Sequence, residues 1–475
     1  MDKQSRLSSD SRLILISNGE PYVHKYKNNK IALEKLAGGL TTGLDPLMKQ
    51  EGGIWIAWGR GNADFKVLDK KNKIKVPDNN GYTLKRVKLD KTEVDGFYYG
   101  FSNETLWPIS HSIISKANYN PEYWKIYQQV NQKYAESALE EVQDNDLVWI
   151  HDYHLTLLPK LIKKEKKKAR IAFFWHIPWP PWEAFGTIPW KNIIMKHILA
   201  ADFIGFHTHS QVENFLNCAR HMNADVDEHN YLVKFNGHLT KINAIPLGVD
   251  YTYLRQTAEN KDMIKKAEEI KNSFNANILL IGIDRLDYTK GIINKLKAID
   301  VLLQKYPNYI GELTLIQRIS PSRTEVYEYQ KMHSEINKTI GDINGRYQKG
   351  GWSHIIYFNQ KISHKKLVPY FLAADIALIT PLIDGMNLVA KEYIAAHKNG
   401  KLILSEFAGA AEKLNDAILV NPHHINGMAE AIHLALELSW EEKIKRYKKL
   451  EENVKDCDIN WWRKEFISKW MKCYD

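Results

Sequence analysis

Short apolar runs rich in Ile, Val, Leu and Phe recur along the chain, and an amphipathic stretch separates each run from the next. The strands of a parallel sheet are buried on both faces and are apolar along their whole length, whereas the helices that connect them are apolar on one side. The pattern therefore predicts an α/β fold with helices on both faces of its sheets. The clearest strands are 13–16, 147–150, 171–175 and 203–206 in the first half, and 278–283, 313–317, 355–358, 376–379 and 402–404 in the second.

The two groups of strands are separated by residues 244–250 (AIPLGVD), which contain Pro and Gly, and by a polar, helical stretch at about 257–274. A chain of 475 residues is long enough for two domains that each have their own core. We therefore expect one doubly wound domain at residues 1–245 and a second at residues 246–458.

The composition disfavours several classes of protein. No apolar run approaches the roughly eighteen residues that a membrane span needs, and the first residues lack the apolar core of a signal peptide, so we expect a cytoplasmic protein. Cys218, Cys457 and Cys473 form no CxxC pair and are too scattered for a disulfide framework. The densest basic run, 160–170, has no interleaved aromatic residues and is typical of a solvated helix face. We therefore expect neither a membrane nor a nucleic acid as a partner.

Polar segments follow the ends of several predicted strands, at 17–22, 151–154, 176–181 and 284–291. In open α/β sheets ligands bind outside the carboxyl ends of the strands, so these segments predict a ligand cleft between the two domains. Loops collect polar residues in any fold, which would explain one such segment but is a weaker explanation for all of them.

Two cations, Arg285 and Lys290, lie five residues apart in GIDRLDYTKG, a loop that is predicted to enter a helix through Gly291. A guanidinium and an ammonium at this spacing can neutralise a diphosphate without a metal ion. The alternative is structural, with Arg285 paired to Asp287 at the start of the helix.

The segment DGMNLVAKE, residues 384–392, lies between a predicted strand and a predicted helix that begins near Asn387. Asn is a good helix cap, and the N–H groups of a first helical turn can bind a phosphate. Glu392 is placed to accept ribose hydroxyls, and Asp384 is placed to hold sugar hydroxyls. The alternatives are an ordinary Asp-Gly turn and an exposed glutamate that pairs with a lysine.

Two further motifs stand in the first half. The segment AGGL at 37–40 begins a predicted helix, and its glycines, Gly38 and Gly39, allow the backbone to approach a phosphate closely. The segment HDYH at 151–154 suggests a metal site, but no further His or carboxylate stands at ligand spacing. We favour an acceptor-binding Asp152 beside packed histidines, and no metal.

His176, in FFWHIPWP, follows four apolar residues and precedes Pro178, so it is predicted to point from a strand end into the cleft. An isolated histidine is more often a core residue, which is the alternative. No GxSxG segment marks a nucleophile elbow.

Together and in this order, the motifs resemble those of the retaining glycosyltransferases of the trehalose-6-phosphate synthase family, glycosyltransferase family 20, from about Leu13 to Trp470. The strings that carry the resemblance are SN, AGGL, YGFSNETLWP, WIHDYHL, FFWHIPWP, GFHT, DRLDYTKG, PSR, GRYQKGGW, PLIDGMNLVAKEY and SEFAGAAE. The number of strings and their order make the resemblance specific.

The resemblance implies a GT-B architecture, in which two Rossmann-like domains face each other across a cleft and a last helix, 459–475, returns to the first. It implies transfer of glucose from a nucleotide-glucose, first of all UDP-glucose, to glucose 6-phosphate, with retention and without metal or cofactor. The donor residues would be Gly38, Gly39, Arg285, Lys290, Asp384, Asn387, Leu388 and Glu392. The acceptor residues would be Tyr98, Trp107, Asp152 and Arg323, and the catalytic set would be Asp152, His176, Arg285, Lys290 and Asp384.

One position departs from the family's pattern. Many members carry Arg after the SN pair, where it contacts the acceptor phosphate, whereas this chain has Gly19. The cations just beyond it that could replace the arginine are His24, Lys25 and Lys27. Because the other acceptor residues are retained, we expect glucose 6-phosphate as the acceptor. The alternative is glucosylglycerol-phosphate synthesis, or transfer to another phosphorylated polyol or cyclitol.

Retention without a well-placed nucleophile implies front-face attack, and double displacement through Asp152 or Asp384 is the alternative. A function of another class, a regulatory homologue that binds sugar phosphate without turnover, is disfavoured by the intact catalytic set. The sequence leaves the donor base open and is compatible with a homo-oligomer. No phosphatase-type segment follows, so a separate phosphatase would act on the product.

Overall fold

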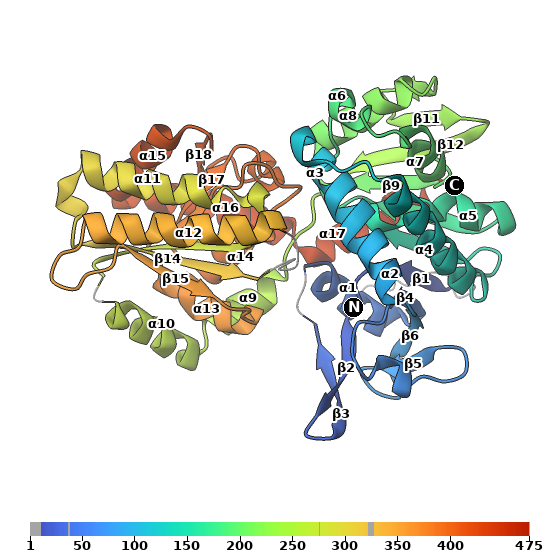
Figure 1. Ribbon diagram of the computed structural model, residues 1–475, viewed down its shortest axis with the longest axis horizontal. Helices are drawn as coiled ribbons and strands as arrows, with labels where there is room; N and C mark the ends of the chain where they lie inside the picture. The colour runs from blue at the N-terminus through green and yellow to red at the C-terminus, as the bar shows by residue number, and fades with distance from the viewer. Residues whose placement is uncertain (1–10, 37–38, 275, 322–326, 475) are drawn as a thin grey trace. The chain divides into compact units, whose positions relative to one another are not determined.

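The computed structural model describes residues 11–36, 39–274, 276–321 and 327–474. The chain divides into two compact units. The first unit contains Met1–Ile245 and Trp462–Asp475, and the second contains Pro246–Trp461. Figure 1 shows the elements of both units, and each unit is described by itself.

The first unit is built on a ten-stranded sheet with the order β10-β11-β12-β9-β8-β7-β1-β4-β6-β5. Every neighbouring pair from β12 to β6 is parallel, and β5, β10 and β11 add antiparallel pairs at the two edges. The strands are β1 (Leu13–Ile16), β4 (Ile54–Trp58), β5 (Lys73–Val76), β6 (Tyr82–Val87), β7 (Leu147–His151), β8 (Arg170–Phe174), β9 (Phe203–Phe206), β10 (Asp225–Asp227), β11 (Leu232–Phe235) and β12 (His238–Ala244).

The connections of the first unit are mainly helical. Its helices are α1 (Gly39–Glu51), α2 (Lys91–Glu93), the π-helix η2 (Val94–Leu106), α3 (Trp107–Ser110), α4 (Pro121–Leu139), α5 (Leu158–Glu165), α6 (Trp182–Phe185), α7 (Lys191–Ile198) and α8 (His209–Arg220). A separate antiparallel hairpin, β2 (Tyr22–Lys27) and β3 (Lys30–Lys35), extends from this unit in Figure 1.

The strand order of the first sheet reverses between β1 and β7, because the chain continues from β1 to β4 on one side and from β7 to β8 on the other. Ligands bind at such a switch point, outside the carboxyl ends of the two strands. Ser17 follows β1 and Asp152 follows β7, so both lie at the switch point of the first unit.

The second unit has a six-stranded, fully parallel sheet with the order β15-β14-β13-β16-β17-β18. Its strands are β13 (Ile278–Arg285), β14 (Leu313–Ser320), β15 (Ile355–Asn359), β16 (Ile376–Ile379), β17 (Lys401–Ser405) and β18 (Ile418–Val420). The order reverses between β13 and β16, so the loops after these two strands form the switch point of this unit.

Helices cover both faces of the second sheet because adjacent strand residues point to opposite faces. Leu280 of β13 is buried in one apolar core with α11 (Ile292–Lys305), α12 (Tyr327–Arg346) and α15 (Ile425–Glu437). Ile281 is buried in the opposite core with α9 (Tyr251–Ala258), α13 (His364–Ala373), α14 (Leu388–Ala396) and α16 (Trp440–Asp456). This unit also contains α10 (Lys261–Ser273).

The last helix, α17 (Ile459–Met471), packs on the first unit from Trp462 onward. The rings of Trp462 and Phe466 stack on Trp149 of β7 with centroid distances of 5.3 and 4.3 Å, and Trp470 is also fully buried. Burial of each such side chain stabilises the fold by about 1.5–3 kcal/mol. This aromatic contact holds the C-terminal helix on the first sheet.

The predicted α/β class and all the predicted strands are confirmed, with ends that differ by no more than a few residues. The sequence interpretation missed the β2–β3 hairpin because its strands mix charged and apolar residues and lie outside the main sheet. It also missed β4 (IWIAW), although this apolar run has fully buried interior residues and is longer than β1.

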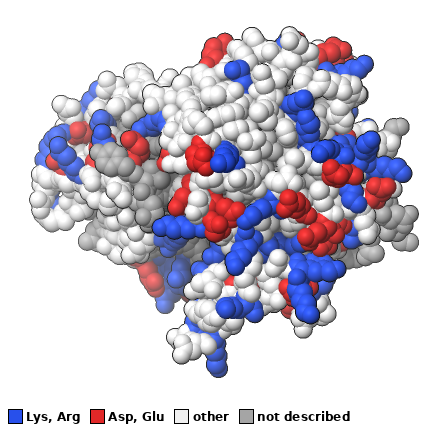
Figure 2. Space-filling view, turned by 45° about the vertical axis from the view of Figure 1, so that its right-hand side comes forward, with Lys and Arg blue, Asp and Glu red and all other residues white. Residues whose placement is uncertain are grey.

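The basic run at 160–170 lies on and after α5, and some of its lysines pair with carboxylates. Lys163 lies 2.9 Å from Asp202, and Lys168 lies 3.8 Å from Asp144. Figure 2 likewise shows Lys and Arg interspersed with Asp and Glu on the face that it draws. Among the described residues, no helix is both long enough and apolar enough to span a bilayer.

Candidate active site

Asp152 occupies an unusual backbone conformation directly after β7, with φ 75° and ψ 165°. This region is strained for any residue except glycine, at a cost of about 1–3 kcal/mol, and such residues cluster at functional sites. Its amide donates to the Phe174 carbonyl oxygen (2.7 Å), and its Oδ1 accepts from the His176 backbone N–H (3.2 Å). The carboxylate is therefore fixed at the carboxyl ends of β7 and β8.

His176 and His151 share a hydrogen bond between Nε2 and Nδ1 (3.0 Å). Burial lowers the pKa of both imidazoles well below the usual value, and the nearby His207 lowers that of His176 further. Both rings are therefore neutral near pH 7, and one donates to the other. A neutral His176 suits hydrogen bonding to a sugar hydroxyl better than charge stabilisation.

Tyr98 belongs to the π-helix η2, an element that is frequent at functional sites. Its ring stacks on His154 with a centroid distance of 5.8 Å and an interplanar angle of 9°. His154 in turn packs on Tyr153, whose ring lies 5.9 Å from that of Trp107. The structure thus brings Tyr98, Trp107 and Asp152 into one aromatic-lined region of the first unit.

In the second unit, the side chains of Lys290 and Asp384 meet, with Nζ 2.5 Å from Oδ2. Lys290 lies on the 3₁₀ turn after β13 and is 8 % exposed, so its ammonium is held largely away from solvent. Arg285 is the last residue of β13 and has an exposed side chain. Both cations therefore lie at the switch point of this unit, Arg285 at the end of β13 and Lys290 in the turn that enters α11 through Gly291.

Asp287 stabilises this turn. Its Oδ1 accepts from the amide and the hydroxyl of Thr289 (3.0 and 2.9 Å), and its Oδ2 accepts from the hydroxyl of Tyr329 (3.1 Å). Asp287 therefore stabilises the turn before α11, the same turn that contains Lys290 and follows Arg285.

Asn387 is the residue before α14, but its side chain does not cap the helix as we expected. Its backbone is left-handed (φ 71°), and its Nδ2 donates to Asp384 Oδ2 (3.1 Å). The first turn of α14, which begins at Leu388, therefore has no side-chain cap and keeps its N–H groups for a ligand. Glu392 is 7 % exposed, which contradicts the alternative of a solvated helix residue.

Two predicted site residues, Gly38 and Arg323, lie outside the described residues, and Gly39 is the first residue of α1. Apart from its two chain neighbours, no described residue has an atom within 4 Å of where a Cβ of residue 19 would be, so there is open space beside Gly19. Across the described ranges, no three His, Cys, Asp or Glu side chains gather closely enough to ligate a metal ion.

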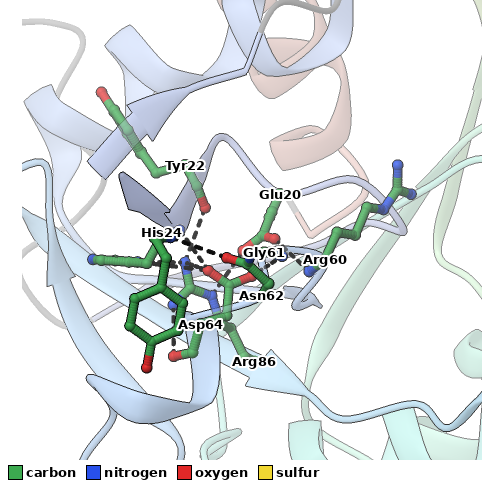
Figure 3. Close-up of polar contacts among 9 residues, drawn as sticks. Glu20, Tyr22, His24, Arg60, Gly61, Asn62, Asp64 and Arg86 are labelled. Atoms are coloured by element: carbon green, nitrogen blue, oxygen red, sulfur yellow. Dashed lines mark hydrogen bonds and ion pairs between the residues drawn. The ribbon is translucent and has the colours of Figure 1, made fainter. Parts of the chain in front are cut away.

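The sequence interpretation did not predict a buried ion cluster formed by Glu20, His24, Asp64 and Arg86 (Figure 3). Arg86 is fully buried and contacts Glu20 (2.8 Å), Asp64 (3.0 Å) and His24 Nδ1 (3.0 Å). Desolvation raises the pKa of Glu20 to about 8, despite the opposing charge of Arg86. No local pattern signals these contacts, since Glu20 and Arg86 are 66 residues apart in the sequence.

The fold and the two switch-point sites define a GT-B glycosyltransferase. The chain matches the model of glycosyltransferase family 20 over residues 11–472, and it belongs to that family.

Three known proteins show the extent of the similarity. The chain is 38 % identical to the trehalose-6-phosphate synthase of Mycolicibacterium gilvum, over 90 % of this chain and 87 % of that protein. An E. coli structure described as trehalose-6-phosphate bound with UDP-2-fluoro glucose has a TM-score of 0.88 and 32 % identity, over 97 % of this chain and 99 % of the other. An α,α-trehalose-phosphate synthase (UDP-forming) from Burkholderia xenovorans in complex with glucose-6-phosphate has a TM-score of 0.87 and 30 % identity, over 97 % and 100 %.

Proposed function

We propose that this enzyme transfers glucose from UDP-glucose to glucose 6-phosphate with retention, and that the products are trehalose 6-phosphate and UDP. The observation that supports the proposal is that Asp152 lies at the switch point of the first unit, while Lys290 and Asp384 meet at that of the second. Support comes from the relatives, one of which carries a UDP-sugar and another glucose-6-phosphate.

In this proposal the second unit binds the donor. Arg285 and Lys290 neutralise the diphosphate, and the uncapped first turn of α14 offers backbone N–H groups at Asn387 and Leu388. The buried carboxylate of Glu392 accepts the ribose hydroxyls, and Asp384 binds the glucose. Gly38 and Gly39 of the first unit would contact the same diphosphate.

The first unit binds the acceptor. Asp152 accepts a hydrogen bond from the acceptor hydroxyl, and Tyr98 and Trp107 line the sugar. His176, neutral because it is buried beside two other histidines, binds a hydroxyl of the transferred glucose. Arg323 is the proposed partner of the acceptor phosphate.

The chemical step follows from these placements. The anomeric oxygen of the acceptor attacks C1 of the donor glucose on the face of the leaving group. The bond from C1 to the diphosphate oxygen breaks, and the acceptor proton passes to that oxygen. Arg285 and Lys290 stabilise the charge that grows on the diphosphate, a contribution of about 3–4 kcal/mol per well-placed donor. Asp384 is a poor nucleophile here because Lys290 is already bound to its Oδ2.

The test is a matrix of UDP-, GDP- and ADP-glucose against glucose 6-phosphate, glucose and phosphorylated polyols, with products identified by mass spectrometry and anomeric configuration by NMR. We expect the UDP-glucose and glucose 6-phosphate combination to have the highest kcat/KM. Faster turnover of another phosphorylated polyol, or an inverted product, would contradict the proposal.

A further inference from the structure

We propose that Arg60 binds the phosphate of the acceptor and supplies the cation that residue 19 lacks. The inference rests on the proposed function and names a residue that contributes to the enzyme's preference for a phosphorylated acceptor.

The guanidinium of Arg60 is held against two aromatic rings. Its Cζ lies 4.6 Å from the ring centre of Trp58 and 5.6 Å from that of Tyr98. The side chain is exposed, and among the described residues no carboxylate forms an ion pair with it. A stacked guanidinium without an anionic partner has its planar donor fork oriented in advance for a phosphate.

The backbone of Arg60 is anchored by the buried ion cluster. Its amide donates to Glu20 Oε1 (2.7 Å), whose other carboxylate oxygen accepts from Arg86 Nε (2.8 Å). Figure 3 shows the Arg60 side chain pointing away from this cluster. The cluster therefore holds the backbone of Arg60 in place, but the guanidinium of Arg60 is not part of it.

Arg60 also lies beside the position of the missing cation. Its Nη2 donates to the carbonyl oxygen of Asn18 (3.2 Å), the residue that precedes Gly19. On its other side, Tyr98 stacks on His154, whose Nδ1 lies 3.9 Å from Asp152 Oδ2. A row of contacts within the first unit thus joins Arg60 to the proposed acceptor carboxylate.

The cations that the sequence analysis offered for this role are engaged elsewhere. His24 is 7 % exposed, contacts Arg86 and has a lowered pKa because of burial. Lys25 and Lys27 pair with Glu34 across the β2–β3 hairpin, at 2.9 and 2.5 Å. Arg60 is therefore the better candidate.

The test compares Arg60→Gln and Arg60→Lys with the wild type in steady-state assays, varying glucose 6-phosphate and UDP-glucose separately. We expect Arg60→Gln to raise the KM for glucose 6-phosphate about 10- to 100-fold, because a charge-assisted hydrogen bond is lost, and to change the KM for UDP-glucose less than about twofold. Arg60→Lys keeps the positive charge but lacks the planar guanidinium, so its KM for glucose 6-phosphate should lie between those of the wild type and Arg60→Gln. The preference for glucose 6-phosphate over free glucose should decrease by the same factor as the KM increases.

Lys25→Gln is the matched control, since it removes a nearby cation that already has a partner, and it should leave both KM values unchanged. Adding Gly19→Arg to Arg60→Gln should restore part of the acceptor affinity. An unchanged acceptor KM in Arg60→Gln, or an equal rise in both KM values, would overturn the inference while leaving the proposed function intact. A wild type that prefers another phosphorylated acceptor would overturn only the identity of the acceptor, and the same comparison on that acceptor would still decide the role of Arg60. A wild type that accepts no phosphorylated sugar or polyol would overturn both.

Discussion

The ammonium of Lys290 and the carboxylate of Asp384 lie 2.5 Å apart, although 94 residues separate them in the sequence. Lys290 follows β13 and Asp384 follows β16, the two strands between which the sheet order reverses. The pair links a proposed diphosphate cation to a proposed sugar-binding carboxylate, so we expect the effects of changing the two side chains to be coupled.

Lys290→Ala should therefore lower kcat by about 100- to 1,000-fold. The variant should still fold, with a lower melting temperature, because the largely buried Asp384 loses its cation. Asp384→Ala should be of similar severity, and the double variant should be little worse than either single one, because coupled residues are not additive. Steady-state kinetics on the four proteins of this cycle measure the coupling. Lys305→Ala, which removes a half-exposed partner of Glu430, is the control and should retain full activity. Fully additive losses would show that the two side chains act independently.

If Arg285 and Lys290 neutralise the diphosphate without a metal ion, wild-type activity should survive EDTA.

Asp152 predicts an unusual order of stability. Alanine normally stabilises a site relative to glycine, but φ 75° and ψ 165° favour glycine. We expect Asp152→Gly to be more stable than Asp152→Ala by about 1 kcal/mol in thermal unfolding. Both variants lack the carboxylate and should lose most of their turnover. An alanine variant at least as stable as the glycine variant would show that the backbone strain is not real.

The buried histidines predict a stability that falls with acid. Because burial lowers the pKa of His151 and His176 in the folded state, the unfolded chain binds more protons below its own histidine pKa of about 6.5. The two histidines contribute fully to the free energy of unfolding above about pH 6.5. This contribution is lost as the pH falls, by up to about 1.4 kcal/mol per pH unit for each histidine. Melting temperatures between pH 5.5 and 7.5 should show a shallower slope for His151→Gln than for the wild type. The exposed His229→Gln should leave the slope unchanged, and an equal effect of the two variants would refute the assignment.

Gly291 is required where the chain enters α11. Its φ is +62°, and a Cβ there would lie 2.6 Å from the carbonyl oxygen of Thr380. Gly291→Ala should destabilise the protein by about 1–3 kcal/mol and reduce activity, since it displaces Lys290. Gly341→Ala is the control in α12, where a Cβ meets nothing within 4 Å, and it should be neutral or stabilising by up to about 1 kcal/mol. Differential scanning fluorimetry measures the stability of both variants, and steady-state assays measure their activity. Equal shifts in the melting temperature of the two variants would contradict the argument.

Arg86 is predicted to be a stability residue and not a ligand-binding one. Arg86→Met would leave the Asp64 carboxylate buried without its cation and the Glu20 carboxyl, whose pKa is already raised to about 8, without its hydrogen-bond donor, at a cost of about 3–5 kcal/mol of unfolding free energy. Lys125→Met removes an exposed pair with Glu122 and should change the unfolding free energy by less than about 0.5 kcal/mol. Denaturant unfolding measures both, and a mild effect of Arg86→Met would mean that water reaches the cluster.

Much of the fold follows from local pattern. The apolar runs that became β1, β7, β9, β13 and β16 are buried on both faces, so their composition alone identifies them. The β2–β3 hairpin lacks that signature because β3 and the last residues of β2 are exposed or half-buried. The expectation that Asn387 caps α14 was wrong, because its side chain is bound to Asp384 instead. The roles of the site residues stay proposals.

The sequence by itself determined the α/β class, the division into two sheets and the location of the polar motifs at strand ends, because each of these depends on residues that are neighbours in the chain. Only the tertiary structure decided which of those residues meet. The contact of Lys290 with Asp384, the stacking of Arg60 on Tyr98 and the enclosure of Arg86 join segments that are far apart in sequence. Such contacts are decided when strands assemble in a particular order around a switch point, and that order depends on packing across the whole sheet, which no local run of residues encodes.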